Sequence, residues 1–186
     1  MQDKIKWDDR YTNDSAVKDA AALLRDNTQL LRGGKALDVA MGTGSNAVLL
    51  ATHGYEVEGV DISSVAVNSV KKYANRNDLP ITAIEADLTD YLFQEQTFDI
   101  IIDFYYLDRN IIPQLKKGLK SGGLIFFETY TEEQLSFGDI LNPDYLLKPN
   151  ELLASFLDYF IIYYHERVVT AAQHSKAIAS LIAQKV

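Results

Sequence analysis

The chain has 186 residues, a length typical of a single domain, and it carries no cysteine and a formal net charge of −8 at pH 7. The absence of cysteine excludes disulfides, thiolate catalysis and cysteine-ligated zinc, and the negative charge argues against a nucleic-acid-binding surface. Residues 1–10 are charged, and no apolar run approaches the ~20 residues of a membrane span, so we expect a cytoplasmic protein without a secretion signal or a membrane partner.

The first half of the chain predicts an alternation of helices and strands. A first helix is expected from Asp14 or Ser15 to about Leu31, with apolar residues at Val17, Ala20, Ala21, Leu24 and Leu31 and a stop at Gly33-Gly34. Strands are then predicted over 36–40, 55–61 and 81–85, and helices over 45–53 and from Ser63 or Ser64 to 77.

The second half predicts the centre of a sheet and an unusual end. Residues 98–104 are almost continuously apolar, as expected for a parallel strand covered on both faces. A helix over 110–119, a turn at 121–123, a strand over 124–128, a loop over 131–148 and a helix from Pro149 to about Leu157 follow. The β-rich runs 159–169 and 177–186 are so close in sequence that they can only pair antiparallel. The sequence therefore predicts an α/β fold, a doubly wound, mostly parallel seven-stranded sheet with a C-terminal antiparallel hairpin.

A glycine turn follows the strand over 36–40. Gly42-Thr43-Gly44 leads into a helix of small and apolar residues, so backbone without side chains and unpaired N–H groups meet at one point. Asp61 ends the next strand, where a carboxylate can accept hydrogen bonds from both hydroxyls of a ribose. Together these features predict a site for a nucleoside-containing cofactor, in which a side chain at Gly44 would occupy ligand space.

Two alternatives stay open for this turn. Residues 42–47 also fit the dinucleotide pattern G-x-G-x-x-A, which would suit a nicotinamide-dependent reductase. Against that, Asp38 would lie badly beside a pyrophosphate, Ser45 and Asn46 suit an amino-acid moiety better, and the chain has no room for a separate catalytic domain. The other alternative is a cofactor-binding module whose catalytic partner is another chain.

Five segments in order carry a family resemblance: LDVAMGTG, VEGVDIS, AIEADLTD, FDIIIDFYYL and LKSGGLIFFE. They resemble the motifs of class I S-adenosylmethionine-dependent methyltransferases over nearly the whole chain, which implies a Rossmann-like sheet in one domain over 1–186. Ala40 replaces the first glycine of the family's D-x-G-x-G-x-G, where a methyl group is tolerable if the backbone stays in a β conformation, and Ser121 replaces a proline. Residues 7–11, Asn46 and Glu151-Leu152 are similar to those of small bacterial tellurite-resistance-type methyltransferases.

The resemblance implies S-adenosylmethionine as cofactor and assigns residues to it. Asp38 would hold the methionine amino group and Asp61 the ribose hydroxyls, while residues 1–32 would cover the cofactor side. The adenine would meet Ile62, the Asp87 carboxylate and the Leu88 amide. Further cofactor contacts are expected at Trp7, Arg10, Tyr11, Ala40, Gly42, Thr43, Gly44, Asn46, Ala86 and Phe104, and Tyr105 and Tyr106 are expected at the substrate mouth.

The acceptor is expected to be a small molecule. Methyl transfer from a sulfonium needs mainly alignment and exclusion of water. A hydroxyl or amine acceptor would need a base, for which only Asp108, Glu128 and His174 are candidates, and no catalytic residue is assigned. The lack of a clear base favours a soft nucleophile, such as a thiol or a chalcogen oxyanion. His53, His165 and His174 share no ligand spacing, so no metal site is expected.

Overall fold

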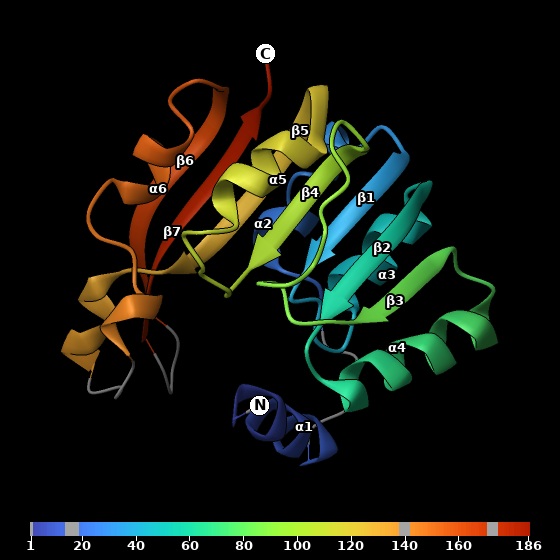
Figure 1. The fold of residues 1–186 in the computed structure, drawn as a ribbon. Coiled ribbons are helices and arrows are strands. Elements are labelled where there is room, and N and C mark those ends of the chain that lie inside the picture. The colour runs from blue at the N-terminus through green and yellow to red at the C-terminus, as the bar shows by residue number, and fades with distance from the viewer. Residues whose placement is uncertain (1, 14–18, 138–141, 171–174) are drawn as a thin grey trace.

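A computed structural model describes residues 2–13, 19–137, 142–170 and 175–186. Its centre is one seven-stranded sheet in the order β3-β2-β1-β4-β5-β7-β6 (Figure 1). Strand β7 runs antiparallel to both β5 and β6, whereas β1 to β5 are parallel to their neighbours within that set. The predicted α/β fold with a C-terminal antiparallel hairpin is confirmed. The strands are β1 (Gly34–Val39), β2 (Tyr55–Asp61), β3 (Ile81–Glu85), β4 (Phe98–Phe104), β5 (Leu119–Tyr130), β6 (Phe160–Thr170) and β7 (Ser175–Gln184).

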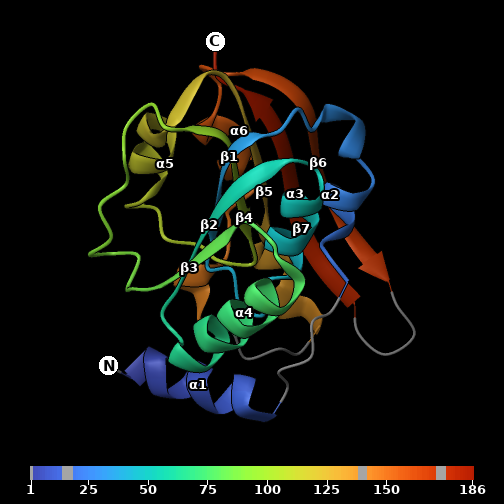
Figure 2. The same cartoon turned by 90° about the vertical axis from the view of Figure 1, so that its right-hand side faces the viewer.

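Helices cover both faces of the sheet, with α5 and α6 on one side and α2 and α3 on the other (Figure 2). Alternate residues of the central strands point to opposite faces, so β4 contributes Ile100 and Ile102 to the apolar cluster on the α2 and α3 side and Ile101 to the other. The helices are α1 (Gln2–Asn13), α2 (Ala22–Arg25), α3 (Ser45–Thr52), α4 (Ser64–Asn77), α5 (Ile112–Gly118) and α6 (Glu151–Ser155).

The predicted first helix is wrong as a continuous element. Its expected start at 14–18 lies outside the described residues, and the remainder is only α2 followed by a 3₁₀ turn over Thr28–Leu30. The backbone leaves the helical conformation at Asn27, whose side-chain amide instead donates to the carbonyl of Leu23. That bond satisfies a carbonyl that a longer helix would have used, which is why Asn favours helix ends. A helix forms earlier, as α1, where the sequence indicated none.

Boundaries differ most around β5 and α6. Strand β5 begins at Leu119 rather than at 124, so the expected turn at 121–123 belongs to an irregular start of the strand. Helix α6 begins at Glu151 rather than at Pro149, because Asn150 takes a left-handed conformation with φ 61°. The expected loop over 131–148 contains 3₁₀ turns at Glu132–Phe137 and Pro143–Tyr145. Within the described ranges no helix is both long and apolar enough to cross a membrane.

Candidate functional site

The carboxyl ends of β1, β2 and β4 meet at one edge of the sheet. Val39, near the end of β1, pairs with Val60 on one side and with Asp103 on the other. The chain then leaves β1 into the glycine turn, β2 into Asp61 and β4 into Tyr105, so these segments lie next to each other. Ligands of open parallel sheets bind at this edge, where neighbouring strands lead to opposite faces.

Asp61 connects the glycine turn to the start of α4. Its Oδ2 accepts a hydrogen bond from the amide of Gly42 at 2.8 Å, and its Oδ1 accepts one from the amide of Ser63 at 2.8 Å. Ser63 in turn caps α4, because its hydroxyl accepts from the amide of Ala66. Burial raises the pKa of Asp61, and the two amide bonds act in the opposite direction. Asp61 therefore has a structural role, while each carboxylate oxygen still has a second lone pair for a ligand.

Asp38 is a buried acid with an unused oxygen. It is 1 % exposed, the amide of Ala47 in α3 bonds to its carboxylate, and its Oδ2 has no hydrogen-bond partner in the described part of the chain. Burial, and then the charge of Asp61, raise the pKa of Asp38 well above its usual range. A cationic hydrogen-bond donor would satisfy this oxygen and favour the charged form.

Asp103 is a second buried acid, on the other face of the sheet. Asp38 pairs with Ile102 across β1 and β4, so Asp103, one residue further along, points away from Asp38. The carboxyl oxygens of Asp103 lack a well-formed hydrogen bond among the described residues; burial followed by the charge of Asp38 raises the pKa of Asp103, and the amide of Tyr106 acts in the opposite direction. Both acids are therefore buried near the same edge of the sheet, but their side chains lie on opposite faces.

The two glycines of the turn have different neighbours. Both have positive φ, 53° at Gly42 and 78° at Gly44. A Cβ at Gly42 would lie 2.7 Å from the hydroxyl oxygen of Tyr11, whereas a Cβ at Gly44 would lie 2.7 Å from a methyl group of Val70 in α4. The expectation that a side chain at Gly44 fills ligand space is therefore wrong, because it would point into the packing of α4.

Ala40 does not have the expected β conformation. Its φ is 50°, in the left-handed region that glycine adopts without strain. An alanine there costs roughly 1–2 kcal/mol relative to its usual conformations. The turn therefore keeps the backbone shape that the family's glycine would give, and the chain tolerates the strain.

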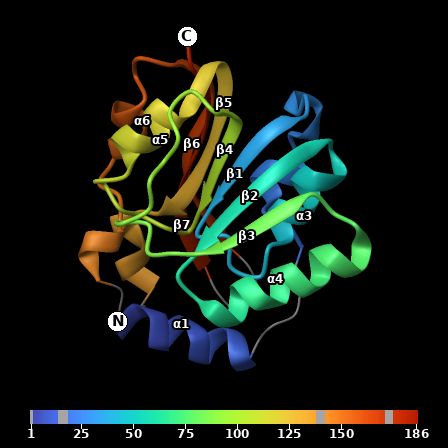
Figure 3. The ribbon, with the colours of Figure 1, turned by 45° about the vertical axis from the view of Figure 1, so that its right-hand side comes forward.

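Helix α1 lies along the start of α4 at this edge of the molecule (Figure 3). The Asp8 carboxylate accepts hydrogen bonds from the hydroxyl of Ser63 at 2.6 Å and from the amide of Val65 at 3.2 Å. Tyr11 reaches the glycine turn, and burial together with the charge of Asp61 raises its pKa to about 12. Helix α1 is therefore fixed to the same two elements that Asp61 connects.

Trp7 and Arg10 form the rest of an aromatic cluster on α1. The rings of Trp7 and Tyr11 stack with centroids 5.8 Å apart, and the Arg10 guanidinium lies 5.0 Å from the centroid of Trp7. The three residues predicted at the N-terminus are thus brought together, and Tyr11 is the one beside the glycine turn.

Other predicted cofactor residues have local partners. Asn46 accepts a hydrogen bond from the amide of Ala21 at 2.8 Å, which fixes α3 to the start of α2. Asp87 accepts from the amide and hydroxyl of Thr89, and these bonds lower the pKa of Asp87. The remaining predicted residues lie at the turn or at the strand ends of the same edge: Thr43 after β1, Ile62 after β2, Ala86 and Leu88 after β3, and Phe104 at the end of β4.

The two tyrosines after β4 differ in environment. Tyr106 packs against the apolar cluster on the α5 and α6 side, while Tyr105 is 40 % exposed. The Tyr105 hydroxyl donates to Glu128 Oε1 at 3.1 Å, and Ser180 and Arg167 from the hairpin lie around the same carboxylate. No local pattern in the sequence indicates the last two, because β7 pairs with β5, and β6 with β7, only in the folded sheet.

A family model described as "Methyltransferase domain" matches residues 36–123. This range runs from β1 through the glycine turn and the ends of β2, β3 and β4 into β5. The match covers a little under half of the chain. Together with the methyltransferase relatives it supports the predicted class I S-adenosylmethionine-dependent methyltransferase family, on most of the segments that carried the resemblance.

Two curated relatives match parts of this methyltransferase-family chain. A ubiquinone biosynthesis O-methyltransferase of Glaesserella parasuis serovar 5 (strain SH0165) is 30 % identical over 138 residues, which cover 68 % of this chain and 58 % of that protein. Hemagglutinin 1 of Eikenella corrodens is 34 % identical over 95 residues, 50 % of this chain and 31 % of that protein. The chain therefore spans less than two thirds of the length of either relative.

Solved structures share the fold at low sequence identity. TehB from Haemophilus influenzae superposes with a TM-score of 0.80 at 19 % identity, covering 97 % of this chain and 67 % of that one. A geranyl diphosphate C-methyltransferase from Streptomyces coelicolor A3(2) gives a TM-score of 0.68 at 14 % identity, covering 87 % and 80 %. At these identities the likeness concerns the fold.

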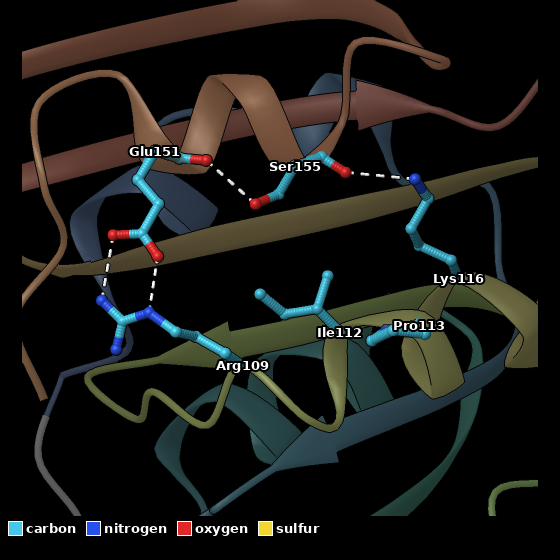
Figure 4. A pocket seen from close by; sticks show the side chains of 6 residues that line it. All are labelled: Arg109, Ile112, Pro113, Lys116, Glu151 and Ser155. Atoms are coloured by element: carbon cyan, nitrogen blue, oxygen red, sulfur yellow. Dashed lines mark hydrogen bonds and ion pairs between the residues drawn. The ribbon is translucent and has the colours of Figure 1, made fainter. Parts of the chain in front are cut away.

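A groove between α5 and α6 lies apart from the predicted site residues of this methyltransferase-family chain (Figure 4). The Arg109 guanidinium binds both oxygens of Glu151, at 2.6 and 2.9 Å, and also donates to the carbonyls of Asp144 and Leu146. Arg109 therefore ties the segment after β4 to the start of α6. The lining residues are Arg109, Ile112, Pro113, Lys116, Glu151 and Ser155.

Proposed function

We propose that this chain is a methyltransferase that binds S-adenosylmethionine at the glycine turn and acts on a small-molecule acceptor. The observation that carries the proposal is the buried Asp38, whose Oδ2 lacks a hydrogen-bond partner among the described residues. A cofactor with an ammonium group would supply that partner. Support comes from the family, and the Streptomyces coelicolor structure with the same fold contains S-adenosyl-L-homocysteine.

In this proposal the end of each strand binds a different part of the cofactor. Asp38 holds the amino group of the methionine part, and the second lone pairs of Asp61 accept from the ribose hydroxyls. Ile62 and the segment after β3, with Asp87, meet the adenine. The aromatic cluster on α1 covers the site, with Tyr11 above the Gly42 backbone.

The chain's own groups would align and enclose the reacting atoms. The cofactor supplies an electrophilic methyl group on a sulfonium, and the acceptor attacks it in line with the breaking bond. Helix α1 and the segment after β4 exclude water, while Asp38 and Asp61 fix the orientation of the methyl donor. Fixed orientation removes most of the entropic barrier of a bimolecular step.

The acceptor class is a separate question. The prediction of a soft nucleophile, a thiol or chalcogen oxyanion, rested on the lack of a recognisable base. The folded structure weakens that reason, because Glu128 accepts a hydrogen bond from Tyr105, a residue predicted at the substrate mouth. The Glaesserella parasuis relative is named as an O-methyltransferase, which favours an oxygen acceptor. A location in the cytoplasm stays a prediction from composition.

Calorimetric titration with S-adenosylhomocysteine, NAD and NADP tests the cofactor. We expect binding of S-adenosylhomocysteine alone, because Asp38 would repel the pyrophosphate of a dinucleotide. Binding of NAD or NADP, or no binding of S-adenosylhomocysteine by folded protein, would contradict the proposal. Transfer of a labelled methyl group from S-adenosylmethionine to a panel of small acceptors then separates an enzyme from a non-catalytic binding module.

A further inference from the structure

A polar network surrounds Glu128 at the carboxyl end of β5. Glu128 is 3 % exposed, its Oε1 accepts from the Tyr105 hydroxyl at 3.1 Å, and its Oε2 accepts from the Ser180 hydroxyl at 2.6 Å. Arg167 Nη2 lies 3.8 Å from Oε2 and balances the charge. A carboxylate held in this way can accept a proton along the hydrogen bond that leads outward, through Tyr105.

The sheet register places this network beside the methyl-donor end of the site. Glu128 pairs with Phe104 and Asp38 pairs with Ile102, and the two β4 residues point to the same face. Asp38 and Glu128 therefore serve one face of the sheet, separated by two strand spacings, about 10 Å. Tyr105 follows Phe104 directly and stands between them at the exit of β4.

The backbone fixes the Tyr105 hydroxyl in this position. Tyr105 has a φ of 62°, rare for a residue with a large side chain, and its amide donates to the carbonyl of Glu128 at 2.8 Å. Its ring lies 5.2 Å from that of Tyr130, and the Lys176 ammonium lies 4.7 Å from the ring centroid. Strained residues held by their surroundings concentrate at functional sites, and this one follows the carboxyl end of β4, where the substrate mouth is predicted.

We propose, resting on the methyltransferase function above, that Tyr105 and Glu128 form a proton relay for an acceptor that carries a proton on oxygen or nitrogen. As the acceptor's lone pair bonds to the methyl carbon, the methyl–sulfur bond breaks and its electrons stay on sulfur. The acceptor's proton moves to Tyr105 Oη, and the Tyr105 proton moves to Glu128 Oε1. The sulfonium charge and the carboxylate charge disappear together, so the step is balanced. Glu128 later returns its proton to water through Tyr105.

A second tyrosine–glutamate pair gives a matched control. The Tyr91 hydroxyl donates to the Glu58 carboxylate, and Glu58 lies in the middle of β2, where it pairs with Leu37 and Thr82. This pair has the same chemistry as the relay but lies away from the strand ends. Substitutions in the Tyr91–Glu58 pair show how much kcat changes when a half-buried tyrosine–carboxylate bond is lost away from the site.

The test uses the full chain, methyl-labelled S-adenosylmethionine and two groups of acceptors. Catechol and tyramine carry protons on the attacking atoms, while 2-mercaptoethanol and tellurite represent soft or ionised acceptors. We expect transfer to the first group, with kcat reduced about 100-fold in both Tyr105→Phe and Glu128→Gln, since general-base assistance contributes at least that much. The double variant should lose no more than either single one, and Tyr91→Phe and Glu58→Gln should retain wild-type kcat.

The pH profile separates the relay from mere positioning. In the wild type the relay takes up the acceptor's proton, so kcat should not follow the ionisation of the acceptor. In Glu128→Gln kcat should rise with pH towards the pKa of the acceptor, because only an ionised acceptor can then react. A substitution that only misplaces the acceptor would lower kcat without changing this profile, and that result would overturn the relay.

Several outcomes count against this inference alone. They are transfer only to 2-mercaptoethanol or tellurite, and unchanged kcat in Tyr105→Phe; transfer to neither group by protein that binds S-adenosylhomocysteine would count against the proposed enzyme as well. A chain that binds no S-adenosylhomocysteine would instead refute the proposed function. If Glu128→Gln fails to fold, Tyr105→Phe decides the matter, because its lost hydroxyl belongs to a residue 40 % exposed.

Discussion

Replacing Asp38 with Asn should stabilise the unliganded protein and weaken its binding of cofactor. The buried carboxyl has an oxygen without a partner, and an amide of the same shape carries no charge. Removing the charge should add about 1 kcal/mol at pH 8, or roughly 2–4 °C in Tm for a chain of this size. A hydrogen bond between charged groups is worth roughly 1.5–3 kcal/mol, so affinity for S-adenosylhomocysteine should fall on the order of 10- to 100-fold.

The pH dependence has a definite sign. Because the pKa of Asp38 is raised in the folded state, its contribution to stability is present at low pH and is lost as pH rises through that raised value. The stability advantage of Asp38→Asn should therefore grow with pH. An ammonium ligand pairs with the carboxylate form, so wild-type affinity should increase as pH rises from the acid range towards pH 8, while that of the variant stays flat.

Thermal unfolding and calorimetric titration across this pH range measure both effects. Asp103→Asn is the matched control, because Asp103 is also a fully buried acid whose oxygens lack a well-formed hydrogen bond among the described residues, but it lies on the other face of the sheet. It should raise Tm without changing the affinity for S-adenosylhomocysteine. Equal affinity of Asp38→Asn and wild type, or a loss shared equally by Asp103→Asn, would refute the assignment of Asp38 to the amino group.

Three further predictions concern the fold around the site. Ala40→Gly should raise Tm by about 1–3 °C, because removing left-handed strain of roughly 1–2 kcal/mol exceeds the entropic cost of glycine; an unchanged or lower Tm would contradict the strain. Arg109→Ala should increase amide hydrogen exchange across 142–151 while costing only about 1 kcal/mol of stability, since the Arg109–Glu151 ion pair is partly exposed. Unchanged exchange there would show that the Arg109 bonds do not hold this segment in place. Gly44→Ala should lower Tm by several degrees through its contact with Val70, and Gly44→Ala with Val70→Ala should recover part of the loss; no recovery would mean that backbone strain alone is responsible.

Local sequence patterns were enough to predict the sheet and to put the candidate site at one edge of it. Strand periodicity, the glycine turn and the acidic end of β2 are local patterns, and each is visible within about ten residues. The parallel order and the carboxyl-end location follow from them, because short alternating strands and helices leave few other topologies. Even the antiparallel end could be predicted, since a short turn permits no other pairing.

The partners and surroundings of individual groups follow only from the tertiary structure. Whether Asp38 has a partner, and whether the Cβ of Gly44 would point to ligand or to Val70, depends on atoms distant in sequence. Ala40 takes a glycine conformation because its neighbours on β2 and β4 fix the turn, a constraint that no local propensity contains.

Helix α1 and the contacts around Glu128 also depend on the folded structure, so local sequence patterns could not predict them. Helix α1 forms where helix propensity indicated none. Packing against α4 and the hydrogen bond that Asp8 accepts from Ser63 stabilise a short helix that would be marginal alone. Tyr105 and Glu128 are 23 residues apart, and Ser180 lies 52 residues beyond Glu128. Only the pairing of β4, β5 and β7 brings the three together, since hydrogen bonding between strands acts over any separation in sequence.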